Sequence, residues 1–302
     1  MWFYAKFFLE TSALVFASLL AAGALEKLGA FRRLTSLAAP LASALGLPRG
    51  LVPLMALSLA SPTAAYAILA KLGDARGVIA AFLLLSPLSF LYDALRFSIP
   101  IALSTLRQAA APYIALTALR LLAFSALCYA AARLYLAHLG RLDAIMASAA
   151  GGETSWRGVV ASTARLWLKI SARLAAATAA VAALDAAGAI RLLGALFGAS
   201  LSLGEAGTAV VAAAAANYIS AMYVAGVFLA RGELTVREAL LALFAGQLVS
   251  APLVHLRAYL PQRVGIFGAR MAVRLTAYTL AFSEVSSAAC LALVLACADV
   301  IN

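Results

Sequence analysis

Long uncharged apolar stretches run through this sequence, and they limit its fold more than any other feature. Four stretches contain no charged side chain: Leu51–Ala70, Gly77–Tyr92, Ala206–Ala230 and Ala239–Val254. A helix needs about 20 mostly apolar residues to cross the hydrocarbon core of a bilayer. With 65% hydrophobic and 12% charged residues, the chain has too little polar surface for a water-soluble fold. The sequence therefore predicts an all-α integral membrane protein, multi-pass in the cell membrane.

Four more stretches carry few charges and complete the set of predicted membrane helices: Phe7–Leu28, Gln108–Ala132, Ile170–Leu184 and Leu275–Ala298. The total is about eight transmembrane helices. Two mixed segments, Leu34–Gly50 and Leu192–Gly204, have too few uncharged residues to cross a bilayer. We therefore expect each of them to be re-entrant or to lie at the membrane interface.

Several short motifs recur in the same order, about 160 residues apart. The matching pairs are Ala24–Arg32 with Ala183–Arg191, Arg96–Pro100 with Arg257–Pro261, and Ala118–Leu121 with Ala272–Leu275. The second pair carries an arginine and a proline, which predicts a bend in each copy. Ordered self-similarity indicates an internal repeat. We expect two tandem homologous units, residues 1–138 and 166–302, joined by a polar and amphipathic linker at 139–165; the copies can be parallel or inverted.

Basic side chains outnumber acidic ones, 23 to 12, but they lie singly between apolar stretches. This pattern favours contact with the phosphates of the lipid bilayer over a nucleic-acid partner. Near the linker, one predicted helix face carries Arg157, Arg165, Lys169 and Arg173. We expect this face to lie on lipid phosphates, with a solvated face as the alternative. Two histidines are too few for a His-rich metal site, and no cofactor is expected.

Ionisable side chains inside the predicted spans are the first site candidates. Each costs at least about 2.5 to 3.5 kcal/mol at the bilayer centre, so it needs a function or a partner. Glu284, with Ser287 on the same helical side, is expected to hold a proton, a cation or a donor group of a solute; the alternative is a structural pair with Arg274 or Arg120. Arg120 and Arg274 occupy matching places, so they either recognise an anionic or carbonyl-bearing solute or cap backbone carbonyls.

Polar interruptions of two apolar stretches are the second set of candidates. Asn217–Tyr218 interrupts one stretch, and Ser61–Pro62 interrupts its counterpart, where Pro62 lacks the N–H that a continuous helix needs. Matching interruptions in two halves point to a transport site. For Asn217, a hydrogen bond between packed helices is the alternative. Gln247, near the second bend, is the last polar candidate.

Motifs of enzymes are weak or missing in this sequence. No phosphate-binding GxxxxGK[ST] loop and no HExxH zinc motif occurs. The string Gly198–Leu201 could imitate an intramembrane hydrolase, with Ser200 as nucleophile and His255 as base. We keep that reading as a remote alternative and expect that the protein is not an enzyme.

The repeated unit resembles the nucleoside-recognition (Gate) domain family. The resemblance is carried by Ala24–Phe31, Leu45–Pro48, Ala214–Ala221, Gly232–Glu238 and Arg274–Leu275. Together the two copies are similar to spore maturation proteins A and B fused in tandem. The resemblance implies solute recognition in the membrane, with nucleosides as the named class.

The expected function is therefore transport or recognition of a small polar solute, with a nucleoside as the class that the resemblance implies. Coupling to protons or sodium ions and assembly into a homo-oligomer would both fit this role. The alternative is a non-transporting membrane scaffold or accessory subunit, in which the intramembrane polar groups only hold helices together.

Overall fold

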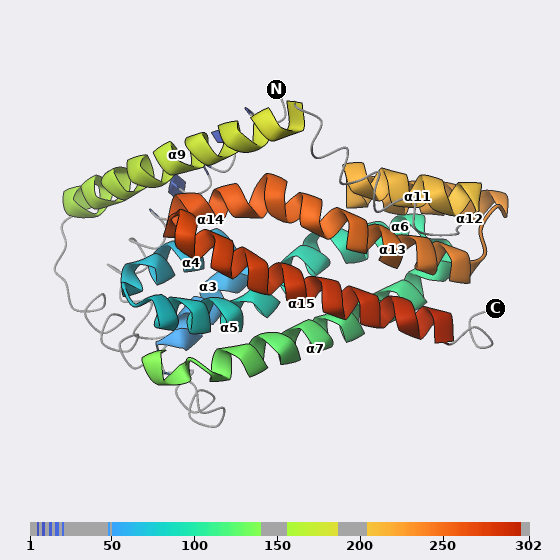
Figure 1. Ribbon diagram of the computed structural model, residues 1–302, viewed down its shortest axis with the longest axis horizontal. Helices are drawn as coiled ribbons and strands as arrows, with labels where there is room; N and C mark the ends of the chain where they lie inside the picture. The colour runs from blue at the N-terminus through green and yellow to red at the C-terminus, as the bar shows by residue number, and fades with distance from the viewer. Residues whose placement is uncertain are drawn as a thin grey trace. The chain divides into compact units, whose positions relative to one another are not determined.

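The computed structural model describes residues 51–139, 156–186 and 204–296, together with single positions between residues 5 and 50. In this part of the chain the regular structure is helical (Figure 1). Within the described residues, four helical stretches are long and apolar enough to cross a membrane: Ala75–Thr105, Arg107–Arg133, Val236–Phe267 and Ala269–Ala296. The prediction of a helical membrane protein is therefore confirmed, with four spans supported by length and composition.

Two of the predicted spans are broken helices. Leu51–Ala70 is divided into α3 (Leu51–Ala60) and α4 (Pro62–Leu69), and Ala206–Ala230 is divided into α11 (Glu205–Ala216) and α12 (Tyr218–Arg231). The prediction that each stretch is one continuous span was wrong. Each half is too short to cross a bilayer alone, because a span needs about 20 residues.

Single extended residues cause both breaks. Ser61 has φ −156° and ψ 98°, and Asn217 has φ −162° and ψ 124°. Each side chain then caps the helix that follows: Ser61 Oγ accepts from the backbone N–H of Ala64 at 3.4 Å, and Asn217 Oδ1 accepts from that of Ile219 at 2.9 Å. Ser and Asn are favoured caps because their short side chains satisfy an N–H that has no helical partner.

Each of two long helices is kinked by a π-helical segment. In the first, α5 (Ala75–Asp93) passes through η2 (Ala94–Ser98) into α6 (Ile99–Thr105). In the second, α13 (Val236–Val254) passes through η5 (His255–Tyr259) into α14 (Leu260–Phe267). These kinks lie where the sequence predicts bends.

Proline explains the position of both π-helical segments. Pro100 and Pro261 follow them closely and have no N–H to donate to the carbonyl four residues earlier. A local widening of the helix accommodates the missing hydrogen bond and the proline ring. Sequence therefore determines where these two long helices bend.

The kinked helices end at residues with positive φ, and long helices follow them. Arg107 has φ 50° and precedes α7 (Ala110–Arg133); Gly268 has φ 82° and precedes α15 (Ala269–Ala296). Short 3₁₀ turns occur at Ala70–Leu72, Arg107–Ala109 and Leu136–Leu139. Along the described chain, one order of elements therefore occurs twice: a broken helix, a kinked helix, a residue with positive φ and a long helix.

Helix α9 (Trp156–Ala186) is a single helix of 31 residues. It joins the end of the predicted linker to the predicted span Ile170–Leu184. Among its described side chains, Arg157, Arg165 and Lys169 are exposed. Several earlier predictions lie outside the described residues: most of Phe7–Leu28, the mixed segments Leu34–Gly50 and Leu192–Gly204, and Ser200.

The chain forms two compact units. Unit 1 contains Met1–Ser89, Cys128–Ala180 and Leu260–Thr276, and unit 2 contains Phe90–Leu127, Val181–Tyr259 and Ala277–Asn302. Each unit therefore includes segments from both predicted sequence copies. The boundaries predicted for the copies, 1–138 and 166–302, and for the linker stay a prediction about the sequence.

In unit 1, aromatic rings and hydroxyl groups hold several segments together. Tyr66 and Phe82 pack with ring centroids 4.8 Å apart, and the buried Arg263 lies over Phe82 at 4.9 Å from the ring centroid. At the N-terminal end, Ser12 Oγ lies 2.7 Å from Ser171 Oγ of α9. Trp167 Nε1 donates to the Ser12 carbonyl over 2.9 Å. These contacts place part of the predicted first helix beside α9.

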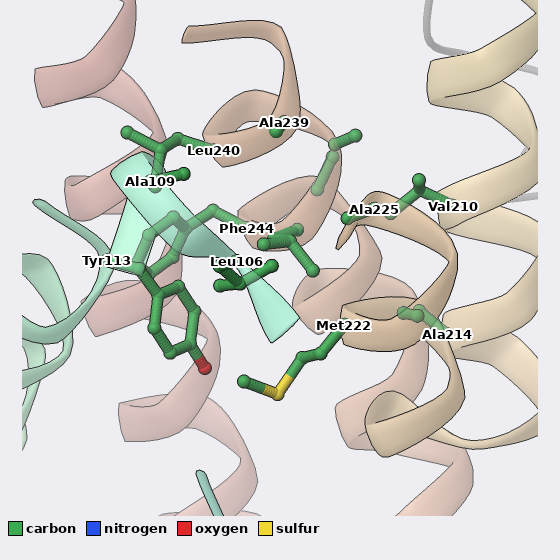
Figure 2. Packing of buried hydrophobic residues seen from close by; sticks show 14 of the residues in the cluster. Leu106, Ala109, Tyr113, Val210, Ala214, Met222, Ala225, Ala239, Leu240 and Phe244 are labelled. Atoms are coloured by element: carbon green, nitrogen blue, oxygen red, sulfur yellow. The ribbon is translucent and has the colours of Figure 1, made fainter. Parts of the chain in front are cut away.

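The core of unit 2 is apolar and tightly packed. Tyr113 and Phe244 are fully buried with their ring centroids 6.0 Å apart, and Met222 belongs to the same cluster (Figure 2). Glycines let the helices approach. A Cβ on Gly246 would lie 2.7 Å from Ala214 Cβ, and one on Gly226 would lie 2.5 Å from the Thr105 carbonyl oxygen. Small residues at such contacts are typical of membrane helices, because packing and not water drives their association.

Candidate functional site

Arg120 of α7 is the centre of a buried polar cluster in unit 2. Its side chain is only 6% exposed, although it lies inside the span Arg107–Arg133. Nη2 donates to Ser283 Oγ of α15 over 2.9 Å, and Cζ lies 4.7 Å from the ring centroid of Phe90. The Nε atom is buried and has no hydrogen-bond partner within the described residues. Arg120 therefore keeps one donor for another group.

Glu284 and Ser287 of α15 add acceptor atoms to the same unit. Glu284 Oε1 is buried and has no hydrogen-bond partner within the part of the chain that the structure describes. Ser287 is 1% exposed, and the same holds for its Oγ. The Glu284 carboxyl is close enough to Arg120 for electrostatic attraction. However, the printed hydrogen bond of Arg120 is to Ser283, the residue before Glu284.

Tyr218 and Gln247 lie beside a tyrosine that sequence reasoning missed. Tyr218 is the first residue of α12, and its hydroxyl lies 3.1 Å from that of the buried Tyr113 of α7. Gln247 of α13 is 7% exposed and lies beside Tyr218; its Oε1 has no hydrogen-bond partner among the described residues. Four helices, α7, α12, α13 and α15, thus contribute polar groups to the cluster.

No signal in the sequence distinguishes Tyr113 from an ordinary core aromatic. It follows Pro112 near the start of α7 and stands among apolar residues. Thr117, one turn further along α7, was missed for the same reason; its buried Oγ1 has no hydrogen-bond partner within the described chain. Their importance follows only from helix packing, which brings them to Tyr218.

Asn217 and Ser61–Pro62 shape the helices and do not present polar atoms to this cluster. Asn217 is exposed, and its Oδ1 caps α12. Its role is to break the helix so that Tyr218 begins a new one. Ser61 and Pro62 belong to unit 1, where Ser61 caps α4 and Pro62 is the first residue of that helix. The predicted hydrogen bond from Asn217 to a neighbouring helix is replaced by this local cap.

Arg274 differs from Arg120 in its surroundings. Arg274 is exposed and belongs to unit 1, whereas Arg120 is buried in unit 2. The two residues also follow the positive-φ positions at different distances: Arg120 lies 13 residues after Arg107, and Arg274 lies six after Gly268. The structure does not support the predicted equivalence of the two arginines.

His255 is buried, and its nearest contacts are with the protein's own backbone and side chains. It is 6% exposed, and Nδ1 lies 2.8 Å from the Ala251 carbonyl oxygen. The serine that would make it a hydrolase base, Ser200, lies outside the described residues. Among the described residues, no group of three or more His, Cys, Asp or Glu side chains could hold a metal ion.

The cluster offers a defined set of atoms to a bound molecule. Arg120 Nε is a donor, while Gln247 Oε1, Glu284 Oε1 and Ser287 Oγ can accept. A buried polar atom without a partner costs about 1 to 3 kcal/mol, so several in one unit call for an additional partner. Comparison of the chain with known protein families, with curated proteins and with solved structures gives no match.

Proposed function

We propose that this chain is a secondary-transporter-like membrane protein that binds a small polar solute at the cluster around Arg120. The observation that carries the proposal is the set of buried, unpartnered polar atoms in unit 2, on Arg120, Gln247, Glu284 and Ser287. Ionisable groups inside membrane spans are costly and commonly mark solute or ion pathways. The broken helix α11–α12 supports the same role, because discontinuous helices form the sites of many transporters.

The atoms of the cluster define the chemistry of the solute. A carbonyl or anionic oxygen would accept from Arg120 Nε, and N–H or O–H groups would donate to Glu284 and Gln247. One guanidinium beside one carboxyl favours a solute without net charge. Nucleosides have this combination of carbonyl, N–H and O–H groups, in agreement with the resemblance to the Gate domain family.

A tandem duplication is part of this proposal. It is supported by the repeated order of elements and by close spacing: η2 and η5 lie 161 residues apart, as do Arg107 and Gly268. Each copy would contribute a broken helix, a kinked helix and a long helix. We further propose a total of about eight membrane-crossing segments in the cell membrane, with the exposed basic residues of α9 at lipid phosphates.

Solute-induced thermal stabilisation of the purified protein in lipid nanodiscs tests the proposal. A panel of nucleosides, nucleobases, amino acids and simple cations is screened against the wild type, and at least one polar organic solute is expected to raise the unfolding temperature. Arg120→Lys keeps the charge but loses Nε, so the shift should fall strongly. Arg274→Lys is the matched control, because Arg274 is exposed, and its shift should equal that of the wild type.

The scaffold alternative is favoured by one observation: Arg120 already contacts Phe90 and Ser283, so it also holds α7 against α15. In a scaffold, Arg120→Lys would lower the unfolding temperature without solute, and no solute in the panel would raise it. In a transporter, the solute-dependent shift is lost even where the unfolding temperature without solute is retained. The two temperatures together separate the alternatives.

A further inference from the structure

The two π-helical segments approach each other within unit 2 at a polar junction that the proposed solute site does not include. Tyr259, the last residue of η5, donates its hydroxyl to Asp93 Oδ2 over 3.4 Å. Asp93 is the residue immediately before η2. Both residues lie well inside candidate membrane spans. π-Helical segments are rare and are often found at functional sites.

His255 and Thr279 support the η5 side of this junction. The Nδ1 atom of His255 lies 2.8 Å from the Ala251 carbonyl oxygen, so Nδ1 carries a proton. Nε2 lies 3.4 Å from Thr279 Oγ1, and the imidazole ring meets the Tyr259 ring edge-to-face, with centroids 5.0 Å apart. The Tyr259 ring is therefore packed against His255, and its hydroxyl is directed to Asp93.

Arg96 does not neutralise Asp93 by an ion pair in the described structure. Arg96 is exposed, donates to the Tyr92 hydroxyl and lies 5.3 Å from the Phe97 ring centroid. Its attraction for Asp93 acts through space only. The charged or titratable neighbours of Asp93 are thus Arg96 and Tyr92 on its own helix and His255, Arg257 and Tyr259 on η5.

We propose that Asp93 binds a proton, so that the junction of the two π-helical segments is a proton site of this protein. An ionised carboxylate in a membrane span needs strong partners, and one long hydrogen bond from Tyr259 is a weak substitute for water. A metal cation fits poorly, because the neighbouring side chains supply cations and donors more than oxygen ligands. A proton needs no further ligands.

Proton binding changes how the two kinked helices hold together. With Asp93 ionised, the bond from Tyr259 is charge-assisted; with Asp93 protonated, it becomes a weaker bond between neutral groups. The bond joins the end of α5 to η5, so its strength controls the contact between the two bends. As the coupling site of a transporter, the junction rests on the proposed transport function, whereas proton binding itself does not.

Infrared difference spectroscopy on the full chain in lipid nanodiscs tests the proposal. A titration from acidic to basic pH is followed at the C=O stretch of a protonated carboxyl, without any solute. The wild type should show a band that is lost in Asp93→Asn and kept in Glu284→Gln. Glu233→Gln, at an exposed residue, is the matched surface control and should leave the band unchanged. Persistence of every titrating band in Asp93→Asn would overturn the proposal.

Tyr259→Phe provides a second variant that keeps the carboxyl. Removing the hydroxyl takes away a bond that favours the ionised form, so the Asp93 band should persist to a higher pH than in the wild type. A band unaffected by Tyr259→Phe would contradict the junction. Replacing choline by sodium at constant ionic strength should leave the midpoint unchanged; a shift would mean that a cation competes, and the assignment to a proton would fall. Because no solute is present, these outcomes do not depend on the solute site.

Discussion

Arg107 is the residue at which local backbone strain is most evident. Its φ of 50° lies in the left-handed region, which costs a non-glycine residue roughly 1 to 2 kcal/mol. The corresponding position before α15 is Gly268, with φ 82°, where glycine adopts this conformation without a steric cost. Two chemically different residues thus perform one turn, and only one of them suits it.

Exchanging residue types at these two positions should move stability in opposite directions. Arg107→Gly relieves the strain but adds chain entropy to the unfolded state, so we expect a net gain of up to about 1 kcal/mol. Gly268→Ala forces a Cβ into the left-handed region and should cost about 1 kcal/mol or more. Thermal unfolding in nanodiscs checks both variants. A loss of stability in Arg107→Gly would contradict the strain argument.

The caps at the two helix breaks are also residue-scale features, and they differ in strength. Asn217→Ala removes a 2.9 Å cap bond and should destabilise the protein by about 1 kcal/mol. Ser61→Ala removes a 3.4 Å bond and should cost less. Asn217→Asp keeps the acceptor and serves as the control. Equal losses in Asn217→Ala and Asn217→Asp, measured by thermal unfolding, would show that the cap does not hold the break.

At the scale of elements, helix α12 depends on one glycine for its contact with α6. A Cβ on Gly226 would approach the Thr105 carbonyl oxygen to 2.5 Å, and a backbone atom cannot move aside as a flexible side chain can. Alanine normally favours a helix over glycine by about 1 kcal/mol. Here the clash should reverse the sign, because overpacking typically costs about 1 to 3 kcal/mol.

Gly226→Ala is therefore expected to lower the unfolding temperature despite its better helix propensity. Ser220→Ala, on the exposed side of the same helix, is the control and should change stability by no more than about 0.5 kcal/mol. An unfolding temperature that rises in Gly226→Ala would mean that α12 and α6 are not packed as described.

Sequence predicted the elements better than it predicted their contacts. The bends at Arg96–Pro100 and Arg257–Pro261 follow from proline chemistry, and both are observed as π-helical kinks. Interruptions were expected at Asn217 and near Pro62, but not complete breaks, because hydropathy does not reveal an extended backbone. An 18-residue average treats Ser61 as one more tolerated polar residue, whereas its φ and ψ end the helix.

At the scale of the whole molecule, the all-helical membrane class required only apolar stretches and composition, and four spans support it. The site could be predicted only in part. Arg120, Glu284, Gln247 and Ser287 were found as polar residues in spans, because lipid makes such residues costly. Tyr113 could not be found in this way. Its proximity to Tyr218 depends on contacts between residues more than 100 positions apart, which no local pattern encodes.

The measurement that tests the central claim most directly is equilibrium binding of the stabilising solute to purified protein in nanodiscs. Removing the charged acceptor with Glu284→Gln should weaken binding by about ten- to a hundredfold, since a hydrogen bond to a charged group contributes roughly 1.5 to 3 kcal/mol. Glu233→Gln, at an exposed carboxyl, should bind like the wild type. Equal affinities for wild type, Glu284→Gln and Arg120→Lys would contradict a solute site at the Arg120 cluster.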